Sequence, residues 1–425
     1  MRLHPVFVCM PASAIDESPL RAMPRSAPPA RILLVAPQPF FESRGTPLNV
    51  LAMTQTLCAA GHEVHLATYA VGETVPVPGL TYHRAARIPG ADEVPIGFSL
   101  RKMVHDAALA ALVVRLLATR RFDVVHAVEE SIFFAMPLAL ARGIPVIGDV
   151  DSCLSDQLAN RGLRHLPGAV PLVRAAERAA LRRARLVITV CRALTEMVAS
   201  RAPGVPVAQI EDCPPEGTSR PADADSVATL RSRWNPDGAP LAVYTGNFAP
   251  YQGLDLLFGA LPTLAAVAPA AHVLLVGGTA AEIASAQSAL AQRGLADRVR
   301  FAGRQPLESM PAFTALADVL VSPRSEGDNT PLKIFAYMAS GRPIVATDRR
   351  THTQVLDHTS ALLCAATPKA LGEALGAVLN DPSAYAARAL EASARAARDF
   401  SRAAFSRKLL AAYDSVLAGV GSLPP

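Results

Sequence analysis

Short apolar runs of four to six residues alternate with longer helical segments along most of the chain. In the first half these runs cover 31–36, 63–68, 123–126, 145–148, 186–190 and 205–210. In the second half they cover 241–245, 272–276, 299–302, 319–322, 344–347 and 361–364. Continuous β-branched and aliphatic runs are typical of parallel strands that are buried on both faces. Their alternation with helices predicts an α/β fold built from doubly wound sheets.

The alternation is interrupted once, at residues 213–224, which are rich in Pro, Gly, Ser and acidic side chains. This composition is typical of a linker. We therefore predict two Rossmann-like domains that face each other across a cleft, the first at 31–213 and the second at 214–397. Residues 398–425 are expected to form a helix that crosses back to the first domain.

Residues 1–30 form an irregular segment of Pro, Ala, Ser and Arg. We expect a disordered extension here, or a stretch that precedes a start at Met23. A signal peptide is the alternative, but His4 and Pro5 interrupt the short apolar stretch that it would need.

Composition excludes several classes of protein. The 425 residues are 51% hydrophobic and 18% charged, which is enough for large cores. A net charge of +5 is too mild to indicate nucleic-acid binding. The six scattered cysteines predict reduced thiols in a cytoplasmic protein and no disulfide framework or zinc site. No apolar run reaches the roughly 18 residues of a transmembrane helix.

The most informative stretch is a strand at 318–322 that is followed by a polar loop at 323–329 and a helix. Thr330 fits the N-cap of this helix, Pro331 its first residue and Gly341 the residue past its end. Ligands of open α/β sheets bind at the carboxyl ends of the strands, where this loop lies. The polar side chains of the loop are Arg324, Glu326, Asp328 and Asn329.

The first strand, at 31–36, leads through a loop into a helix at 46–60 with Thr46 as its N-cap. Gly45 lies at the end of this loop, so backbone N–H groups at the helix N-terminus can approach a phosphate. The stretch has no G-x-G-x-x-G, so it does not predict a dinucleotide-binding loop.

Four segments resemble one family. They are RILLVAPQPFFESRGTPLNV with GHEVHLAT, FDVVHAVEES with GIPVIGDVDS, LAVYTGNFAPYQGLDLLFGA, and SPRSEGDNTPLKIFAYMASGRPIVATD. In this order, over residues 31–405, they resemble glycosyltransferase family 4, whose members have the two-domain GT-B fold. The resemblance implies transfer of a sugar from a nucleotide-sugar donor to a glycan or lipid-linked acceptor. It implies an acceptor-side domain at 31–213 and a donor-binding domain at 214–397. It also implies retention of anomeric configuration and no metal or other cofactor.

The donor signature departs from the family pattern. Glu326 matches the first signature Glu, which contacts the donor sugar, but Ala336 stands where a second Glu holds the ribose. Two basic residues that contact the diphosphate are replaced by Asn247 and Gln252. Each charge-assisted contact is worth about 1.5–3 kcal/mol, so other cations are needed. The candidates are Arg324, Arg304 and Lys333, with the N-terminus of the following helix.

The resemblance and the residue chemistry together assign the predicted site. A catalytic role is predicted for Glu326, Arg324, Lys333 and Glu129. Donor binding is predicted for Gly246, Asn247, Gln252, Gly253, Arg304, Glu326, Gly327, Asn329, Thr330, Pro331 and Leu332. Acceptor-side roles are predicted for Gly45, Thr46, His126, Glu129, Glu130 and Asp151.

The acceptor-side residues leave two alternatives open. Glu129 and Glu130 follow the strand at 123–126 and can orient an acceptor hydroxyl or accept its proton. Asp149 and Asp151 spell the Asp-x-Asp that holds a divalent metal in other glycosyltransferases. Because that motif belongs to a single-domain fold, we expect Asp151 to contact the acceptor and expect no metal site.

Basic side chains accompany the apolar helix at 100–119 and continue through 161–185. Those of the first group are Arg101, Lys102, Arg115, Arg120 and Arg121. Basic and apolar surface together suits an anionic membrane, so we expect association with the inner face of a membrane. The alternative is a core helix with solvated, charged ends.

Two other functions fit the same pattern. The departures at Asn247, Gln252 and Ala336 leave open a GT-B scaffold that binds a sugar nucleotide or a partner without transfer. Epimerisation of a sugar nucleotide is the other alternative. The sequence does not identify the donor sugar, the base or the acceptor.

Overall fold

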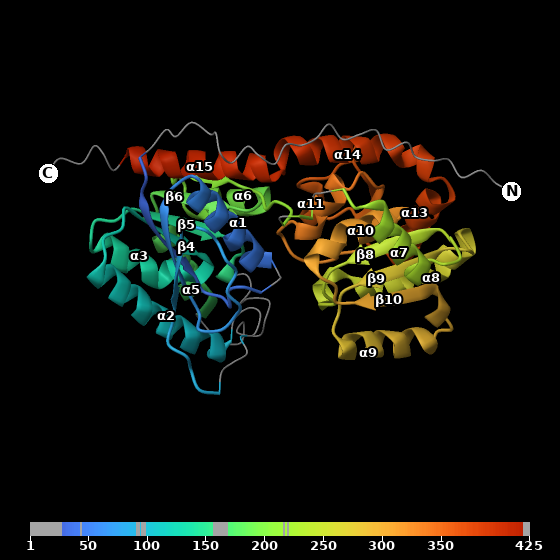
Figure 1. Ribbon diagram of the computed structural model, residues 1–425, viewed down its shortest axis with the longest axis horizontal. Helices are drawn as coiled ribbons and strands as arrows, with labels where there is room; N and C mark the ends of the chain where they lie inside the picture. The colour runs from blue at the N-terminus through green and yellow to red at the C-terminus, as the bar shows by residue number, and fades with distance from the viewer. Residues whose placement is uncertain are drawn as a thin grey trace.

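The chain folds into two α/β domains that lie side by side (Figure 1). The structure is a computed structural model, and it describes residues 28–42, 45–90, 94, 99–155, 169–215, 217–218 and 221–419. The predicted extension at 1–30 therefore lies almost wholly outside the described residues. No helix within the described ranges has the length and hydrophobicity needed to span a membrane.

The first domain contains a seven-stranded parallel sheet in the order β3-β2-β1-β4-β5-β6-β7. Its strands are β1 Arg31–Ala36, β2 Glu63–Thr68, β3 Leu80–Arg84, β4 Val124–Val128, β5 Val146–Val150, β6 Leu186–Thr189 and β7 Val207–Gln209. Its helices are α1 Gly45–Ala59, α2 Leu100–Thr119, α3 Ile132–Leu140, α5 Ala169–Leu181 and α6 Arg192–Arg201. Helices α2 and α3 pack on one face of the sheet and α1 on the other.

The second domain contains a six-stranded parallel sheet in the order β10-β9-β8-β11-β12-β13. Its strands are β8 Leu241–Thr245, β9 His272–Val276, β10 Val299–Gly303, β11 Val319–Ser322, β12 Ile344–Thr347 and β13 Leu362–Cys364. Its helices are α7 Ala224–Trp234, α8 Leu254–Val267, α9 Ala280–Ala291, α10 Met310–Leu316, α11 Leu332–Ala339, α12 Arg350–Thr353, α13 Pro368–Asn380 and α14 Ala386–Asp399. Helices α8 and α13 cover one face, and α10, α11 and α14 cover the other.

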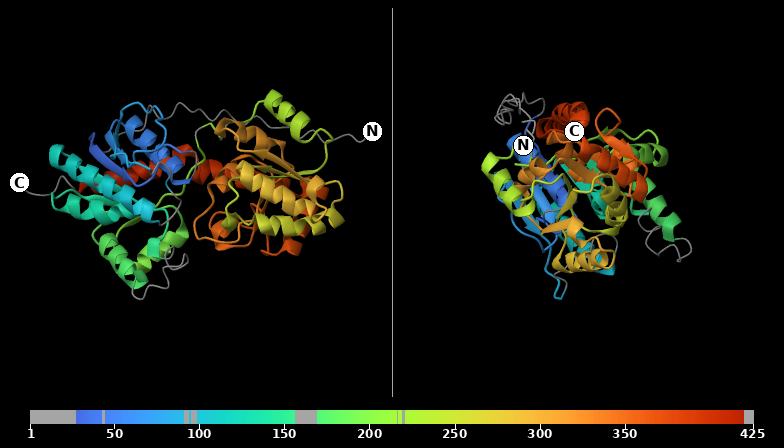
Figure 2. Two further views of the ribbon diagram at one scale, coloured as in Figure 1. Left: turned by 90° about the horizontal axis from the view of Figure 1, so that it is seen from below. Right: turned by 90° about the vertical axis from the view of Figure 1, so that its right-hand side faces the viewer.

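The last helix, α15 Arg402–Ala418, returns to the first domain and packs beside α1. Its residues Phe405, Leu409 and Tyr413 are buried in the same core as α1. Helices α14 and α15 thus run along both domains as one bridge (Figures 1 and 2).

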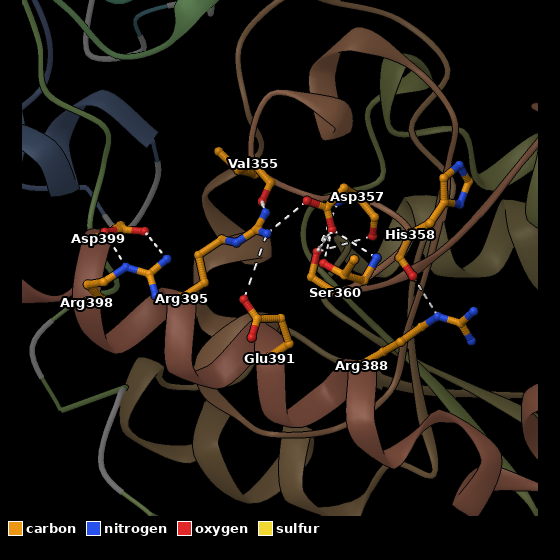
Figure 3. A network of polar contacts seen from close by, with 10 residues as sticks. Val355, Asp357, His358, Ser360, Arg388, Glu391, Arg395, Arg398 and Asp399 are labelled. Carbon is orange, nitrogen blue, oxygen red and sulfur yellow. Dashed lines mark hydrogen bonds and ion pairs between the residues drawn. The ribbon is translucent and has the colours of Figure 1, made fainter.

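Helix α14 is attached to the second domain by the loop that precedes β13 (Figure 3). Arg395 donates to Asp357 at 2.8 Å, and Arg388 donates to the backbone oxygen of His358 at 2.8 Å. These contacts fix the helix on the domain from which α15 departs.

Most strands agree with the sequence prediction to within about two residues, and the two-sheet α/β class is confirmed. Strand β3 was missed. It is an edge strand whose side chains are mostly half-buried, and such a strand lacks the continuous apolar run of an interior one. The predicted strand at 123–126 extends to Val128, so Glu129 follows it directly.

Two predicted helix starts are wrong by one or two residues. Helix α1 begins at Gly45, so Thr46 lies inside its first turn and is not its N-cap. Helix α11 begins at Leu332, and Pro331 occupies the N-cap position with an extended ψ of 130°. Proline fixes φ but leaves ψ free, so it fits the residue before a helix as well as the first residue inside it.

Candidate functional site

Each sheet has one point where the strand order reverses, between β1 and β4 and between β8 and β11. In open parallel sheets, ligands bind in the crevice beyond the carboxyl ends of the strands at such a point. The two carboxyl edges face each other, because Cys191, after β6, lies 3.7 Å from the backbone oxygen of Asp328, after β11. The predicted donor and acceptor residues therefore lie on opposite sides of one interface.

Arg324 shapes the loop that follows β11. Its Nε donates to the backbone oxygen of Glu326 at 2.8 Å, and its Nη2 donates to Asn329 Oδ1 at 2.7 Å. Its guanidinium also lies 5.1 Å above the ring centre of Tyr251, and the residue is only 7% exposed. Gly327 needs a φ of +96° and passes so close to Arg324 Nη2 that a Cβ would lie 2.5 Å from it. The predicted catalytic Arg324 thus contacts its own loop.

Two glycines bring the loop after β8 against this structure. Gly253 has a φ of +76°, and a Cβ there would lie 2.0 Å from the backbone oxygen of Pro323. Gly246, at the end of β8, has a φ of +140°, and a Cβ there would lie 2.8 Å from Lys333 Nζ. The loops after β8 and β11 and the first turn of α11 therefore meet at the reversal point.

Three polar atoms around this meeting point are buried and have no hydrogen-bond partner among the described residues. They are Lys333 Nζ, Thr330 Oγ1 and Gln252 Oε1. Lys333 Nζ lies 3.7 Å from the ring centre of Tyr244. Burial, and to a lesser degree the nearby charge of Arg324, holds the pKa of Lys333 well below its usual value. An unsatisfied buried polar group costs about 1–3 kcal/mol, so this arrangement is costly unless a ligand satisfies it.

The remaining predicted donor residues differ in position. Glu326 and Asn247 are exposed, and Asn247 accepts a hydrogen bond from Ala249 N at 3.2 Å. Asn329 bonds Arg324 through its side chain and accepts from Thr351 Oγ1 at 2.7 Å through its backbone oxygen. Pro331 and Leu332 form the start of α11. Arg304 is exposed and makes no hydrogen bond or ion pair with the rest of the described chain, so the structure does not bring it into the loop.

On the acceptor side, His126 is enclosed. It is fully buried in the middle of β4, and not at the strand end as the sequence predicted, with Nε2 3.2 Å from Asp149 Oδ2 and Nδ1 2.7 Å from the hydroxyl of Tyr413 on α15. Both ring nitrogens are thereby engaged within the domain. The predicted acceptor-side role of His126 stays a prediction, and its contacts are those of a residue that positions Asp149.

Glu129 is the first residue of a short turn, Glu129–Ser131, and adopts a left-handed φ of +50°. Its Oε1 accepts from Ser152 Oγ at 3.2 Å. Burial, with the charge of Glu130, raises the pKa of Glu129 to about 7. Glu130 forms an ion pair with Lys102 of α2. Lys102 was predicted to face a membrane, but it faces this carboxylate, and that part of the basic surface is corrected.

Asp151 is 7% exposed, and its Oδ1 has no partner among the described residues. Burial and neighbouring carboxylates, above all Asp149, raise its pKa, while a hydrogen bond with the Thr46 side chain opposes the rise. Gly45, beside Thr46, is exposed, with open space where a Cβ would point. In the described part of the chain, no three His, Cys, Asp or Glu side chains converge as a metal centre would require.

The structure adds residues that the sequence did not indicate. Asp212 lies in the segment that the sequence assigned to the domain end and the linker, yet burial and the charge of Asp149 raise its pKa to about 7. Tyr244 and Tyr251 place aromatic faces under Lys333 and Arg324. Gln354, after α12, bonds the loop that follows β11. Aromatic residues beside the glycines of GNFAPYQG were the only local signal for this part of the site.

Two family models match most of the chain between them. Residues 45–211 match the model described as Glycosyltransferase Family 4, and residues 239–381 match the one described as Glycosyl transferases group 1. The two matches fall on the two domains in turn.

Two curated relatives illustrate the sequence similarity. The chain is 32% identical over 192 residues to the GDP-mannose-dependent alpha-(1-6)-phosphatidylinositol monomannoside mannosyltransferase of Mycolicibacterium smegmatis, a match that covers 43% of this chain and 50% of that protein. The chain thus spans half the length of this relative. It is 23% identical over 393 residues to the phosphatidyl-myo-inositol mannosyltransferase of Mycobacterium leprae, covering 91% of this chain and 97% of that protein.

Solved structures share the fold over nearly the whole chain. The sucrose-phosphate synthase of Thermosynechococcus elongatus superposes with a TM-score of 0.75 at 19% identity, covering 92% of this chain and 100% of that one. HepE of Anabaena, solved in complex with UDP and glucose, superposes with a TM-score of 0.70 at 16% identity, covering 93% and 100%.

The raised pKa of Glu129 predicts a pH-dependent stability. The folded-state pKa of about 7 lies above the usual value of 4.5, so the stabilisation that comes from the protonated form is complete below pH 4.5 and is lost as the pH rises through 7. Glu129→Gln should therefore change the free energy of unfolding more favourably at pH 8 than at pH 5, when each value is compared with that of the unchanged protein at the same pH. One pKa unit corresponds to about 1.4 kcal/mol. Urea unfolding at both pH values measures the difference.

Glu373→Gln is the matched control, because that side chain lies 53% exposed on α13. Its free energy of unfolding should change equally at both pH values. A Glu129→Gln effect that does not differ between pH 5 and pH 8 would contradict the assigned burial.

Proposed function

Because this chain belongs to glycosyltransferase family 4 and has the GT-B fold, we propose that it transfers a sugar from a nucleotide-sugar donor to an acceptor held by the first domain. The observation that carries this proposal is the pair of unpartnered buried atoms Lys333 Nζ and Thr330 Oγ1. They lie where the loops after β8 and β11 meet the N-terminus of α11. A cation, a hydroxyl and a helix N-terminus together suit a diphosphate.

In the proposed complex the diphosphate lies against the first turn of α11. Lys333 replaces the two family cations that are absent at Asn247 and Gln252, because its Nζ is the buried cation without a partner in this part of the described chain. The exposed Glu326 contacts the donor sugar from the loop that Arg324 holds in place. The positive charges act on the departing diphosphate, and we propose that no metal is required.

The proposed reaction keeps the anomeric configuration. The acceptor oxygen forms a bond to the anomeric carbon on the face from which the diphosphate oxygen departs, and the acceptor proton passes to the leaving phosphate. The charge that develops on this phosphate is stabilised by Lys333 and the helix N-terminus. The acceptor enters past Gly45, Glu129 and Asp151. A Glu129 carboxyl with a pKa of about 7 is suited to orient the acceptor hydroxyl near neutral pH.

A non-catalytic scaffold is the second candidate, because Ala336 supplies no ribose ligand on α11. Sugar-nucleotide epimerisation is the third.

The names of two similar proteins suggest the first donors to test. One curated relative is named as GDP-mannose-dependent, and one similar solved structure contains UDP and glucose. Calorimetric titration with GDP-mannose and UDP-glucose, followed by a donor screen with product mass measured, separates the three. Absence of binding to every sugar nucleotide would rule out the transferase, and binding without a heavier product would favour the scaffold.

Replacement of the buried ammonium should separate stability from donor binding. Lys333→Met preserves volume and removes the charge, so the dissociation constant of the nucleotide sugar should rise at least roughly tenfold, as expected for a lost charge-assisted contact of about 1.5–3 kcal/mol. The free energy of unfolding should not fall, because an unpaired buried charge is removed. Calorimetry and urea unfolding measure the two quantities.

Lys369→Met, at a side chain that is 81% exposed on α13, is the matched control and should leave donor affinity unchanged. An unaltered affinity in Lys333→Met would remove Lys333 from the donor site.

We also propose that the first domain docks on an anionic membrane. Leu172 of α5 is 72% exposed and shares its helix and the turn after it with the exposed Arg178 and Arg182. Met103 and Val104 are exposed apolar residues on α2. Such a surface combines apolar insertion with attraction to anionic headgroups. The basic residues at 161–168 lie outside the described residues.

Sedimentation with vesicles tests the docking surface. The protein should pellet with phosphatidylglycerol vesicles at low salt and much less at high salt, because exposed charges are screened. Arg178→Glu combined with Arg182→Glu should keep it in the supernatant. Equal sedimentation of this variant, or no sedimentation of the unchanged protein, would contradict membrane docking.

A further inference from the structure

Helix α6 of the first domain has no side-chain cap of its own. Its N-cap residue is Cys191, which makes no side-chain hydrogen bond to the helix. The first N–H groups of a helix have no partner within it, and they are usually satisfied by a neighbouring Ser, Thr, Asp or Asn side chain. The N–H of Ala193 is satisfied differently, because it donates at 2.7 Å to Oε1 of Gln354 in the second domain.

The other end of the same amide holds the loop after β11. Gln354 Nε2 donates at 2.7 Å to the backbone oxygen of Asp328. Cys191 Sγ lies 3.7 Å from that same oxygen. One side chain thus joins the start of α6 to the loop that carries Glu326, and Figure 1 shows α6 and α11 on the facing sides of the two domains.

The contact continues through the loop to Arg324. Asn329, the residue after Asp328, accepts from Arg324 Nη2 at 2.7 Å, and Arg324 Nε donates to the backbone oxygen of Glu326 at 2.8 Å. Thr351 Oγ1 holds the backbone oxygen of Asn329 at 2.7 Å. The position of the loop therefore depends on a continuous set of hydrogen bonds that begins in the other domain.

We propose that Gln354 is a positioning residue that couples the docking of α6 against the second domain to the shape of the donor loop. When the domains separate, the amide oxygen of Gln354 loses the N–H donor of Ala193, and the Asp328 oxygen loses its contact with Cys191. When they close, the helix N-terminus orients the amide, and the amide orders residues 328–329. This inference rests on the proposed function, because it takes the loop after β11 as part of the donor site.

A second contact at the same interface provides a control. Arg350 of α12 forms an ion pair with Glu196 of α6, and both side chains are about half exposed. This pair joins the two domains without contacting the loop. Removal of this ion pair therefore measures how the loss of a contact between the domains, by itself, affects hydrogen exchange in the loop.

Two substitutions separate the ends of the bridge. Gln354→Glu keeps an oxygen acceptor for the N–H of Ala193 and places a negative charge at a helix N-terminus, where it is favourable. The carboxylate has no N–H to donate to the Asp328 oxygen. Gln354→Leu removes both contacts.

Hydrogen–deuterium exchange of the protein without substrate provides the first measurement. We expect Gln354→Leu to speed exchange at both 324–331 and 190–196, Gln354→Glu to speed it at 324–331 with little change at 190–196, and Arg350→Ala to leave 324–331 unchanged. Unchanged exchange at 324–331 in both Gln354 variants would overturn the proposal. So would an equal effect of Arg350→Ala, because the loop would then respond to the interface as a whole.

Kinetics with the donor identified by the screen provide the second measurement. Loss of one hydrogen bond should raise the KM for the donor roughly 2- to 10-fold in Gln354→Glu, with a smaller effect on the KM for the acceptor. A protein that binds no sugar nucleotide but shows the expected exchange pattern would retain the coupling and lose the proposed function. Equal changes in both KM values would assign Gln354 a general structural role and overturn the coupling.

Discussion

The donor side of the interface depends on the buried guanidinium of Arg324. Because this side chain donates to the backbone oxygen of Glu326 and to Asn329 and lies over the face of Tyr251, it fixes the backbone from Glu326 to Asn329. Lys333 is then the cation left without a partner at the meeting of β8, β11 and α11 in the described chain. The structure thus assigns the ordering of the loop to Arg324, whose charge also lowers the pKa of the nearby Lys333, and the proposed contact with the ligand is left to Lys333.

The acceptor side has the opposite electrostatic character. Glu129, Asp151 and Asp212 all have pKa values raised first by burial and further by neighbouring carboxylates, and the charge of Asp149 acts on all three. A cluster of buried carboxyl groups disfavours the approach of an anion, whereas the unpartnered ammonium of Lys333 on the other side favours one. This difference in charge agrees with the proposed arrangement, in which the diphosphate lies on the second domain and the hydroxyl-bearing acceptor on the first.

Much of the fold was predictable because interior parallel strands are continuous apolar runs, as in β8 and β9. Edge strand β3 is half-buried and lacked that signal. The family was predictable because its motifs are local in sequence, around Gly253 and Glu326. The bridge through Gln354, the burial of Asp212 and the pairing of Lys102 with Glu130 join residues far apart in sequence, and no periodicity or composition encodes such pairs. The predicted domain boundaries and residue roles stay predictions.

Helix α15 affects the order in which the cores of the two domains can form during synthesis. The core of the first domain includes Phe405, Leu409 and Tyr413, and the last of these bonds the buried His126 of β4. During synthesis, the first domain therefore emerges complete in all its strands but without part of its core, while the second domain can close once α14 has appeared. Domains usually fold in the order of their synthesis. Here the first domain is synthesised first, but its core is complete only after α15 has been made. The core residues that α15 covers therefore stay exposed while the second domain is synthesised.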